Sequence, residues 1–236
     1  MQGPLKAKLC GQLHVGGGQG HGSLKATLLN QRSRQWLTQQ AKVCTLVYSL
    51  TWRLLMLTFR RRRRLPHFDV DHATYFVTAC LAGSVPARGR FKHEDRGAFA
   101  ASEEWLDTKT TVRLLADRRL ARVVRDEIRR GAGIHYELHA YVVMASHIHL
   151  VFTPNAGWSR PVIMNALKGR SSRACNALLQ RRGAFWQSES FDRVVRDARE
   201  FEQFVNYVEF NPVKAGLCTR PEEWECSSAR HVGLVG

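Results

Sequence analysis

The fold of this chain is decided by the stretch IHYELHAYVVMASHIHLVFT, which covers residues 134–153. Its two parts, Ile134 to Met144 and His147 to Thr153, both alternate polar and apolar residues, as half-buried strands do. Only Ala145 and Ser146 separate them. The stretch therefore predicts an antiparallel pair of strands with a very tight connection.

The segments on either side of this pair predict a mixed α+β domain. Thr74 to Leu81 is rich in β-branched and aromatic residues and stops at Gly83, as a strand does. Four more segments show a periodic or extended pattern: a helix over Phe99 to Arg130 with a break near Asp117, a helix over Pro161 to Arg182, an extended run from Phe185 to Val195, and a helix over Ala198 to Phe210 that Pro212 ends. This order predicts a ferredoxin-like sandwich, with helices on one face of an antiparallel sheet and a further C-terminal helix.

Basic residues are concentrated in the N-terminal part of the chain, whose formal net charge is +16. Twelve of the 36 Lys and Arg residues precede Phe68, and no acidic residue does. The other 24 oppose 20 Asp and Glu residues, which leaves only +4 for the rest. A glycine-rich run and the lack of periodicity predict that residues 1–64 form a disordered basic extension, and that residues 65–236 form one domain.

Cysteine usage and hydropathy argue against a disulfide-rich protein, a zinc knuckle and a membrane protein. The six cysteines are scattered, with no CxxC pair, which argues against a disulfide framework or a zinc knuckle and favours a reducing cytoplasm. The apolar run from Val43 to Phe59 is interrupted by Arg53 and by several Ser and Thr residues, so it is short and impure for a membrane span. We therefore expect a cytoplasmic protein without a membrane anchor.

Two histidines share one face of the second strand of the pair. The period of two in a strand sends His147 and His149 to one side and Ile148 and Leu150 to the other. Adjacent imidazoles on one face can share a cation. A half-exposed polar strand gives the same pattern, so the pair alone is a weak signal.

The last predicted helix strengthens that signal. Tyr207 and Asn211 are spaced i, i+4 and lie above one another on its surface. If this helix packs beside the strand of His147 and His149, Asn211 completes a site of two imidazoles and an amide oxygen that suits Mg²⁺ or Mn²⁺. Tyr207 then stands beside a metal-bound phosphate as a nucleophile. An amphipathic tyrosine and an ordinary helix-end asparagine explain the same residues separately.

Several short motifs in a fixed order resemble the REP-associated tyrosine transposases of the HUH single-tyrosine superfamily. They are YFVT from Tyr75, VMASHIHL from Val143, FWQSESFD from Phe185, the pair Asn206 and Tyr207, and NPVKAGL from Asn211. The resemblance covers roughly Leu65 to Arg230.

The resemblance implies a ferredoxin-like fold, a Mg²⁺ or Mn²⁺ ion, and cleavage of single-stranded DNA at repeat hairpins through a 5′-phosphotyrosine. His147 and His149 match the His-hydrophobic-His motif, Tyr207 matches the nucleophile, and Asn211 matches the third metal ligand. Many relatives have Pro-Asn where this chain has Ala145 and Ser146, and no counterpart of the N-terminal extension is apparent.

Basic residues outside this site are candidates for contacts to DNA phosphates. They are Arg60, Arg61, Arg62, Arg63 and Arg64 near the N-terminal boundary, and Lys168, Arg170 and Arg173 on the helix after the histidine strand. A solvated charge run explains the arginine cluster equally well. For Phe185 and Trp186 core packing is favoured over base stacking, and His135, Glu137 and His139 are expected to form a polar sheet face.

The sequence thus favours a metal-dependent DNA transposase, monomeric or homodimeric, that works at the nucleoid on single-stranded DNA and DNA hairpins. One alternative is a non-catalytic nucleic-acid-binding module of the same fold, although no RNP-like strand is present. Another is a metal nuclease that uses water in place of Tyr207.

Overall fold

The computed structural model of this protein describes residues 58–62, 65–70, 72–85 and 104–232. Its main sheet contains β3 (Tyr75–Cys80), β4 (Tyr136–Val143), β5 (His147–Pro154) and β6 (Phe191–Val194), in the order β4-β5-β3-β6. All neighbouring strands are antiparallel. Because α3 (Arg118–Gly131) lies between β3 and β4 in the chain and α4 (Arg160–Leu178) lies between β5 and β6, this is the ferredoxin-like arrangement, and the predicted fold class is confirmed.

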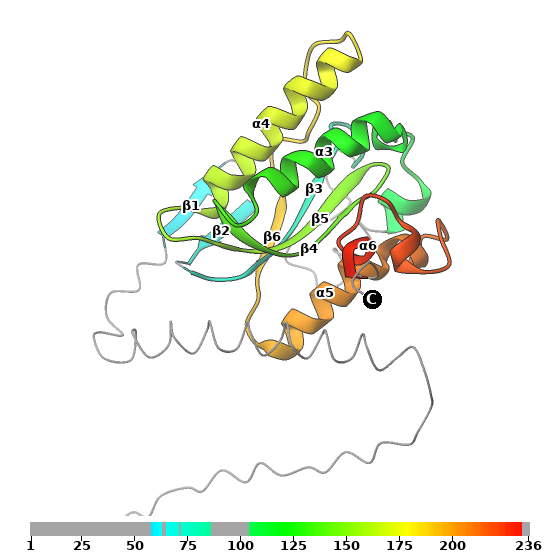
Figure 1. Ribbon diagram of the computed structural model, residues 1–236. Coiled ribbons are helices and arrows are strands. Elements are labelled where there is room, and N and C mark those ends of the chain that lie inside the picture. Colours follow the sequence, from blue (N-terminus) through cyan, green and yellow to red (C-terminus); the bar gives the residue numbers. More distant parts are fainter. Residues whose placement is uncertain (1–57, 63–64, 71, 86–103, 233–236) are drawn as a thin grey trace, which may run out of the picture.

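Helices cover both faces of this sheet. Figure 1 shows α3 (Arg118–Gly131) and α4 (Arg160–Leu178) together on one face and α5 (Ala198–Lys214) on the other. Each face has its own apolar core: Ile148 and Leu150 pack under α3 and α4, whereas Val151 packs under α5 with Val205. The predicted pair of helices on one face and the separate C-terminal helix are both present.

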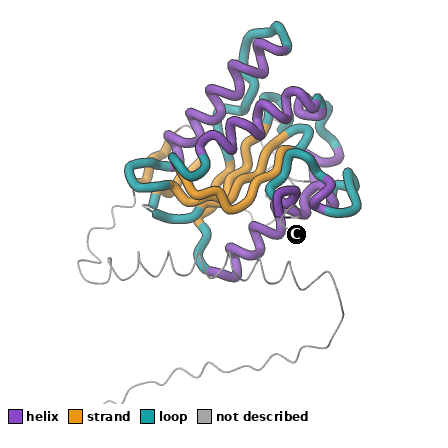
Figure 2. Tube along the Cα trace, in the orientation of Figure 1, coloured by secondary structure: helices purple, strands orange, loops and turns teal. Residues whose placement is uncertain are grey.

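The described chain also contains several short elements. They are the strands β1 (Thr58–Arg62) and β2 (Leu65–Asp69), a helical segment at residues 104–108, the 3-10 turns η1 (Leu114–Ala116) and η2 (Pro221–Glu223), and the terminal turn α6 (Ala229–Val232). Figure 2 distinguishes the loops that join these elements (teal) from the helices (purple) and strands (orange). No helix within the described ranges has the length and apolar character of a membrane span.

The boundary predicted at residue 64 lies in the chain between the strands β1 and β2. Strands β1 and β2 pair antiparallel, with Phe59 opposite Phe68 and Arg60 opposite His67. Residues 1–57, which make up most of the predicted disordered extension, lie outside the described residues.

The tight connection between β4 and β5 is as the sequence predicts. Strand β4 ends at Val143 and β5 begins at His147, and the Met144 amide donates to the carbonyl of His147 at 2.9 Å. The helix predicted over Phe99 to Arg130 is interrupted before Asp117, as expected: residues 104–108 are helical, residues 109–113 are irregular, and residues 99–103 lie outside the described residues. Helix α3 then begins at Arg118 because the Asp117 carboxylate caps it, accepting from the Arg119 amide at 2.9 Å.

Two further predicted boundaries were wrong. The extended run from Phe185 forms a strand only from Phe191 to Val194, and before it Trp186 makes a single bridge to Leu81. Helix α5 does not end before Pro212 but runs through it to Lys214. Proline removes only one donor from the helix, and the Ala215 amide still donates to the Asn211 carbonyl at 3.0 Å. Asn211 therefore lies within the helix rather than at its end.

Candidate active site

The histidine pair lies on the face of the sheet that α5 covers. His147 and His149 are 1% and 0% exposed, so the alternative of a half-exposed polar strand is excluded. Their Nε2 atoms lie 3.0 Å apart. Buried imidazoles cost free energy unless their nitrogens are satisfied, so each ring needs partners at both nitrogens.

Hydroxyl groups hold the other nitrogen of each ring. The Nδ1 atom of His147 lies 2.9 Å from the Ser146 hydroxyl, which itself donates to the Leu106 carbonyl at 3.3 Å. With its proton so directed, the Ser146 oxygen accepts from Nδ1 of His147, which leaves a lone pair on Nε2. The Nδ1 atom of His149 lies 2.8 Å from the Thr78 hydroxyl of β3. Outer contacts of this kind fix the ring orientation of metal-binding histidines.

Helix α5 brings Tyr207 beside these rings. Asp197 caps the start of this helix, because its carboxylate accepts from the Glu200 amide at 2.8 Å. The edge-on ring of Tyr207 lies 5.4 Å from the ring of His149 and 5.8 Å from that of Phe76, measured between centroids. Tyr207 itself is half-buried, so its ring is anchored while part of it still faces solvent.

Asn211 occupies the position one turn further along the same face of α5. Its side chain is buried, and Nδ2 lies 3.4 Å from Nε2 of His149. Its Oδ1 atom has no hydrogen-bond partner among the described residues. Rotation of the amide by half a turn exchanges the two atoms and directs the oxygen at the histidine pair. An unpartnered buried oxygen next to two imidazole nitrogens is what a cation would satisfy.

These donors fit a small divalent ion. An octahedral ion with ligands about 2.1 Å away separates neighbouring ligand atoms by about 3.0 Å, and the two Nε2 atoms lie 3.0 Å apart. Within the described ranges no cluster of three His, Cys, Asp or Glu residues could hold a metal. The set of His147, His149 and Asn211 therefore depends on its amide for the third ligand.

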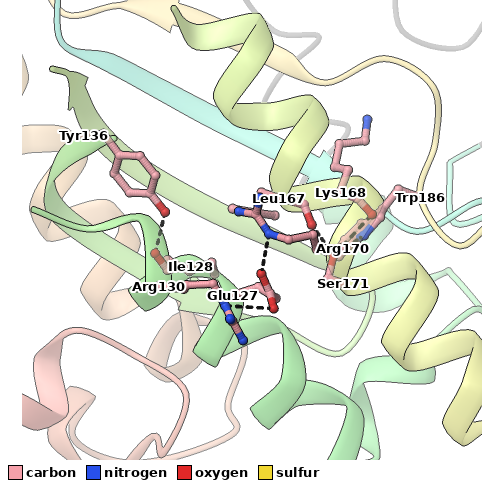
Figure 3. A network of polar contacts seen from close by, with 9 residues as sticks. All are labelled: Glu127, Ile128, Arg130, Tyr136, Leu167, Lys168, Arg170, Ser171 and Trp186. Carbon is pink, nitrogen blue, oxygen red and sulfur yellow. Dashed lines mark hydrogen bonds and ion pairs between the residues drawn. The ribbon is translucent and has the colours of Figure 1, made fainter. Parts of the chain in front are cut away.

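The basic residues predicted on α4 lie on the other side of the sheet from the histidines. Arg170 donates through Nε to Glu127 of α3 at 2.8 Å, and Glu127 also pairs with Arg130 at 3.2 Å. Figure 3 shows the Lys168 side chain directed away from this network. Arg170 therefore joins two helices, whereas Arg173 is exposed.

Lys168 combines a charge with partial burial. Its Nζ atom donates to the Ser188 carbonyl at 3.2 Å and to the Ser190 hydroxyl at 3.3 Å. Burial lowers the pKa of Lys168 to about 8. The arginine cluster near the N-terminal boundary was also predicted to contact DNA. Arg60, Arg61 and Arg62 belong to β1, but the structure does not describe their side chains, and Arg63 and Arg64 lie outside the described residues.

Core packing was predicted correctly for Phe185 and Trp186, whereas the regular polar face predicted for His135, Glu137 and His139 is not formed, because β4 begins after His135 and has a bulge between Leu138 and Ala140. Phe185 and Trp186 are 1% and 6% exposed, and the indole of Trp186 donates to the Ser171 hydroxyl at 2.9 Å, so core packing is confirmed for both (Figure 3). The ring of His135 packs at a tilt against Trp158 with centroids 3.9 Å apart, whereas Nε2 of His139 lies 2.8 Å from the Thr153 hydroxyl. These histidines thus have separate neighbours.

Two contributors to the site were missed from the sequence. Thr78 and Ser146 hold the histidine rings, but neither belongs to a recognisable metal-binding pattern. Ser146 is the chain neighbour of His147, but adjacent residues of a strand point to opposite faces, so alternation does not suggest its contact with the ring. The role of Thr78 appears only once the pairing of β3 with β5 is known, because that pairing places Thr78 opposite His149.

Comparison with known proteins gives matches to transposases. Residues 115–211, which include both histidines, Tyr207 and Asn211, match the model of the family described as IS200-like transposase. The REP-associated tyrosine transposase of Escherichia coli (strain K12) is 24% identical over 94 residues, which are 39% of this chain and 54% of that protein. The match thus spans about half the length of the relative. A solved REP-associated tyrosine transposase bound to a REP hairpin aligns with 73% of this chain and 84% of its own at 19% identity, with a TM-score of 0.48.

Proposed function

We propose that this chain, in which residues 115–211 match the IS200-like transposase family, cleaves and rejoins single-stranded DNA by transesterification, with Tyr207 as the nucleophile. The observation that carries this proposal is the meeting of α5 with β5. There Tyr207 packs on His149, and Asn211 presents a buried amide beside the same ring. A phenol and three metal-ligand candidates thereby share one small volume.

The reaction conserves the energy of the phosphodiester bond. The Tyr207 oxygen forms a bond to phosphorus, the bond from phosphorus to the 3′ oxygen breaks, and that oxygen leaves as a 3′-hydroxyl after taking a proton. The phenol proton passes to water. In the reverse direction a 3′-hydroxyl attacks the 5′-phosphotyrosine, so cleavage and joining need no external energy source.

His147, His149 and Asn211 would hold a Mg²⁺ or Mn²⁺ ion, which when bound supplies charge stabilisation to a phosphate. The protein contributes orientation. Ser146 and Thr78 fix the two imidazoles from behind, and the stacked ring of Phe76, 5.7 Å from His149, packs against one of them. Because these supports lie on adjacent strands, the ligand positions are set before any ion arrives.

The descriptions of two relatives support the proposed substrate. The E. coli protein is REP-associated, and the solved relative is bound to a REP hairpin. We infer that this chain acts on a DNA hairpin with a single-stranded flank, as a monomer or homodimer at the nucleoid. Arg60 to Arg64, Arg173 and Lys168 are the basic residues proposed to contact its phosphates.

A covalent adduct tests the proposal. A labelled DNA hairpin with a single-stranded flank is incubated with the protein and Mg²⁺, and the products are separated under denaturing conditions. We expect a protein–DNA adduct that is lost in Tyr207→Phe and kept in Tyr141→Phe. Tyr141 is a matched control, because it is a buried tyrosine in the core on the other face of the sheet, and its hydroxyl has no partner among the described residues.

The rival functions give different products. A binding module would retain the hairpin without cutting it, and a nuclease that uses water would cut it without an adduct. Cleavage that persists in Tyr207→Phe would overturn the role assigned to the phenol.

A further inference from the structure

Lys214 continues the line of functional residues on α5. It follows Tyr207 by seven positions and Asn211 by three, and these spacings place all three on one side of a helix. The segment matched by the transposase family ends at Asn211, so Lys214 lies just beyond it. The last residue of α5 therefore belongs to the same stripe as the candidate nucleophile and metal ligand.

The ammonium group of Lys214 lies over the phenol ring. Its Nζ atom is 5.7 Å from the centroid of Tyr207, within the range of a cation–π contact. The side chain is exposed, and within the described ranges no carboxylate lies at ion-pair distance from it. The charge is thus held next to the nucleophile without being neutralised by an acidic neighbour.

Among the described residues, one further cation lies over an aromatic ring of α5, and it is already paired with a carboxylate. The guanidinium of Arg193 lies 5.6 Å from the centroid of Phe204, but it also pairs with the Glu200 carboxylate at 2.6 Å. Arg193 therefore contributes to packing and to the start of α5. Lys214 keeps its hydrogen-bond donors for a ligand.

The end of α5 is built so that Lys214 stays in register with Tyr207. The helix passes through Pro212, and the chain turns only at Gly216, whose φ of 70° lies in the left-handed region that suits glycine. The Leu217 amide donates back to the Pro212 carbonyl at 2.9 Å. A helix that ended before Pro212 would have released the Lys214 side chain from this stripe.

We propose that Lys214 binds a non-bridging oxygen of the phosphate that Tyr207 attacks, and holds the same phosphate after it becomes the phosphotyrosine. This role rests on the proposed function and extends it to a further residue. An ammonium is a mobile point charge with three donors, so it can follow a phosphate from the diester to the covalent intermediate. The alternative is a lysine that only stabilises the C-terminal end of the helix.

Binding of DNA in the absence of chemistry tests the phosphate contact. In the Tyr207→Phe background and without metal, affinity for the labelled hairpin with a single-stranded flank is measured over a series of salt concentrations. Loss of one phosphate contact in Lys214→Met should reduce the slope of log affinity against log salt by about 0.7. Lys214→Arg should restore the slope, and Lys109→Met should leave it unchanged. Lys109 is a matched control, an exposed lysine 6.0 Å from the Trp105 centroid.

The rate of adduct formation at saturating DNA tests the second half of the role. It should fall about tenfold or more in Lys214→Met, with partial recovery in Lys214→Arg. A helix-end role would lower only the melting temperature and leave the salt slope and the rate unchanged, and that result would overturn the proposal. The salt slope is read without cleavage, so it still decides on Lys214 if no adduct forms with the wild-type protein.

Discussion

Replacing Thr78 by valine removes the hydroxyl that holds His149 while keeping the shape of the side chain. Thr78 is buried, its Cα is paired with that of His149, and its hydroxyl lies 2.8 Å from the Nδ1 atom. Without this partner the imidazole loses a constraint on its orientation and its tautomer. Loss of such an outer contact typically lowers metal affinity about 10- to 100-fold, which corresponds to about 1.4–2.7 kcal/mol.

The assay is a Mn²⁺ titration followed by electron paramagnetic resonance, in Tyr207→Phe protein so that no cleavage occurs. Thr74→Val serves as the matched control. Thr74 lies just before the same strand and shares a buried hydrogen bond of 2.7 Å with Thr153, remote from the histidine pair in the register of the sheet. Both variants should lose about 1 kcal/mol of stability from one hydrogen bond. Equal Mn²⁺ affinity in the two variants would refute the reasoning.

Three further predictions concern stability. The pKa of Lys168 is lowered to about 8 in the folded state, so the unfolded chain binds more protons than the folded chain between about pH 8 and 10.4. The free energy of unfolding should therefore rise with pH through this window, and Lys168→Met should abolish the rise in urea titrations. Gly131→Ala should cost about 1–3 kcal/mol, because the new methyl group would lie 2.5 Å from a buried tyrosine ring, whereas Gly169→Ala, with its nearest atom at 3.6 Å, should be neutral or stabilise α4 by up to about 1 kcal/mol in thermal melts. Asp192→Asn should lower the free energy of unfolding by about 3–5 kcal/mol, because it leaves the Arg160 guanidinium, now paired with Asp192 at 3.1 Å, buried without a compensating charge. A smaller loss in urea titrations would show that water solvates this charge.

The strands in which polar and apolar residues alternate could be predicted from the sequence. The strands around Ala145 and Ser146 were predicted because polar and apolar residues alternate on both sides of a very short connection. The break predicted near Asp117 is confirmed, because the Asp117 carboxylate caps a new helix, but the irregular residues 109–113 and the 3-10 turn η1 before it were not predicted. A helix-capping residue inside a segment of helical periodicity therefore marks the start of a new helix, even where the periodicity continues.

The sequence predicted which side chains come together at the candidate site, but not which residues hold the two histidine rings in place. The spacing of Tyr207 and Asn211 places them on one face whatever the fold, and the parity of His147 and His149 does the same on a strand. The extension of α5 beyond Pro212 was missed, since a proline near a helix end is normally a stop signal. The partners of the imidazoles depend on which strand pairs with β5, which is a property of the sheet rather than of any local pattern.

The most direct test is to locate the covalent bond itself. After reaction of the wild-type protein with the hairpin and Mg²⁺, the adduct is digested with protease and nuclease, and the remaining peptide is sequenced by mass spectrometry. The expected result is a nucleotide joined through its 5′ phosphate to the peptide that contains Tyr207. Attachment to another residue, or a 3′ linkage, would contradict the placement of the nucleophile on α5 beside the histidine pair.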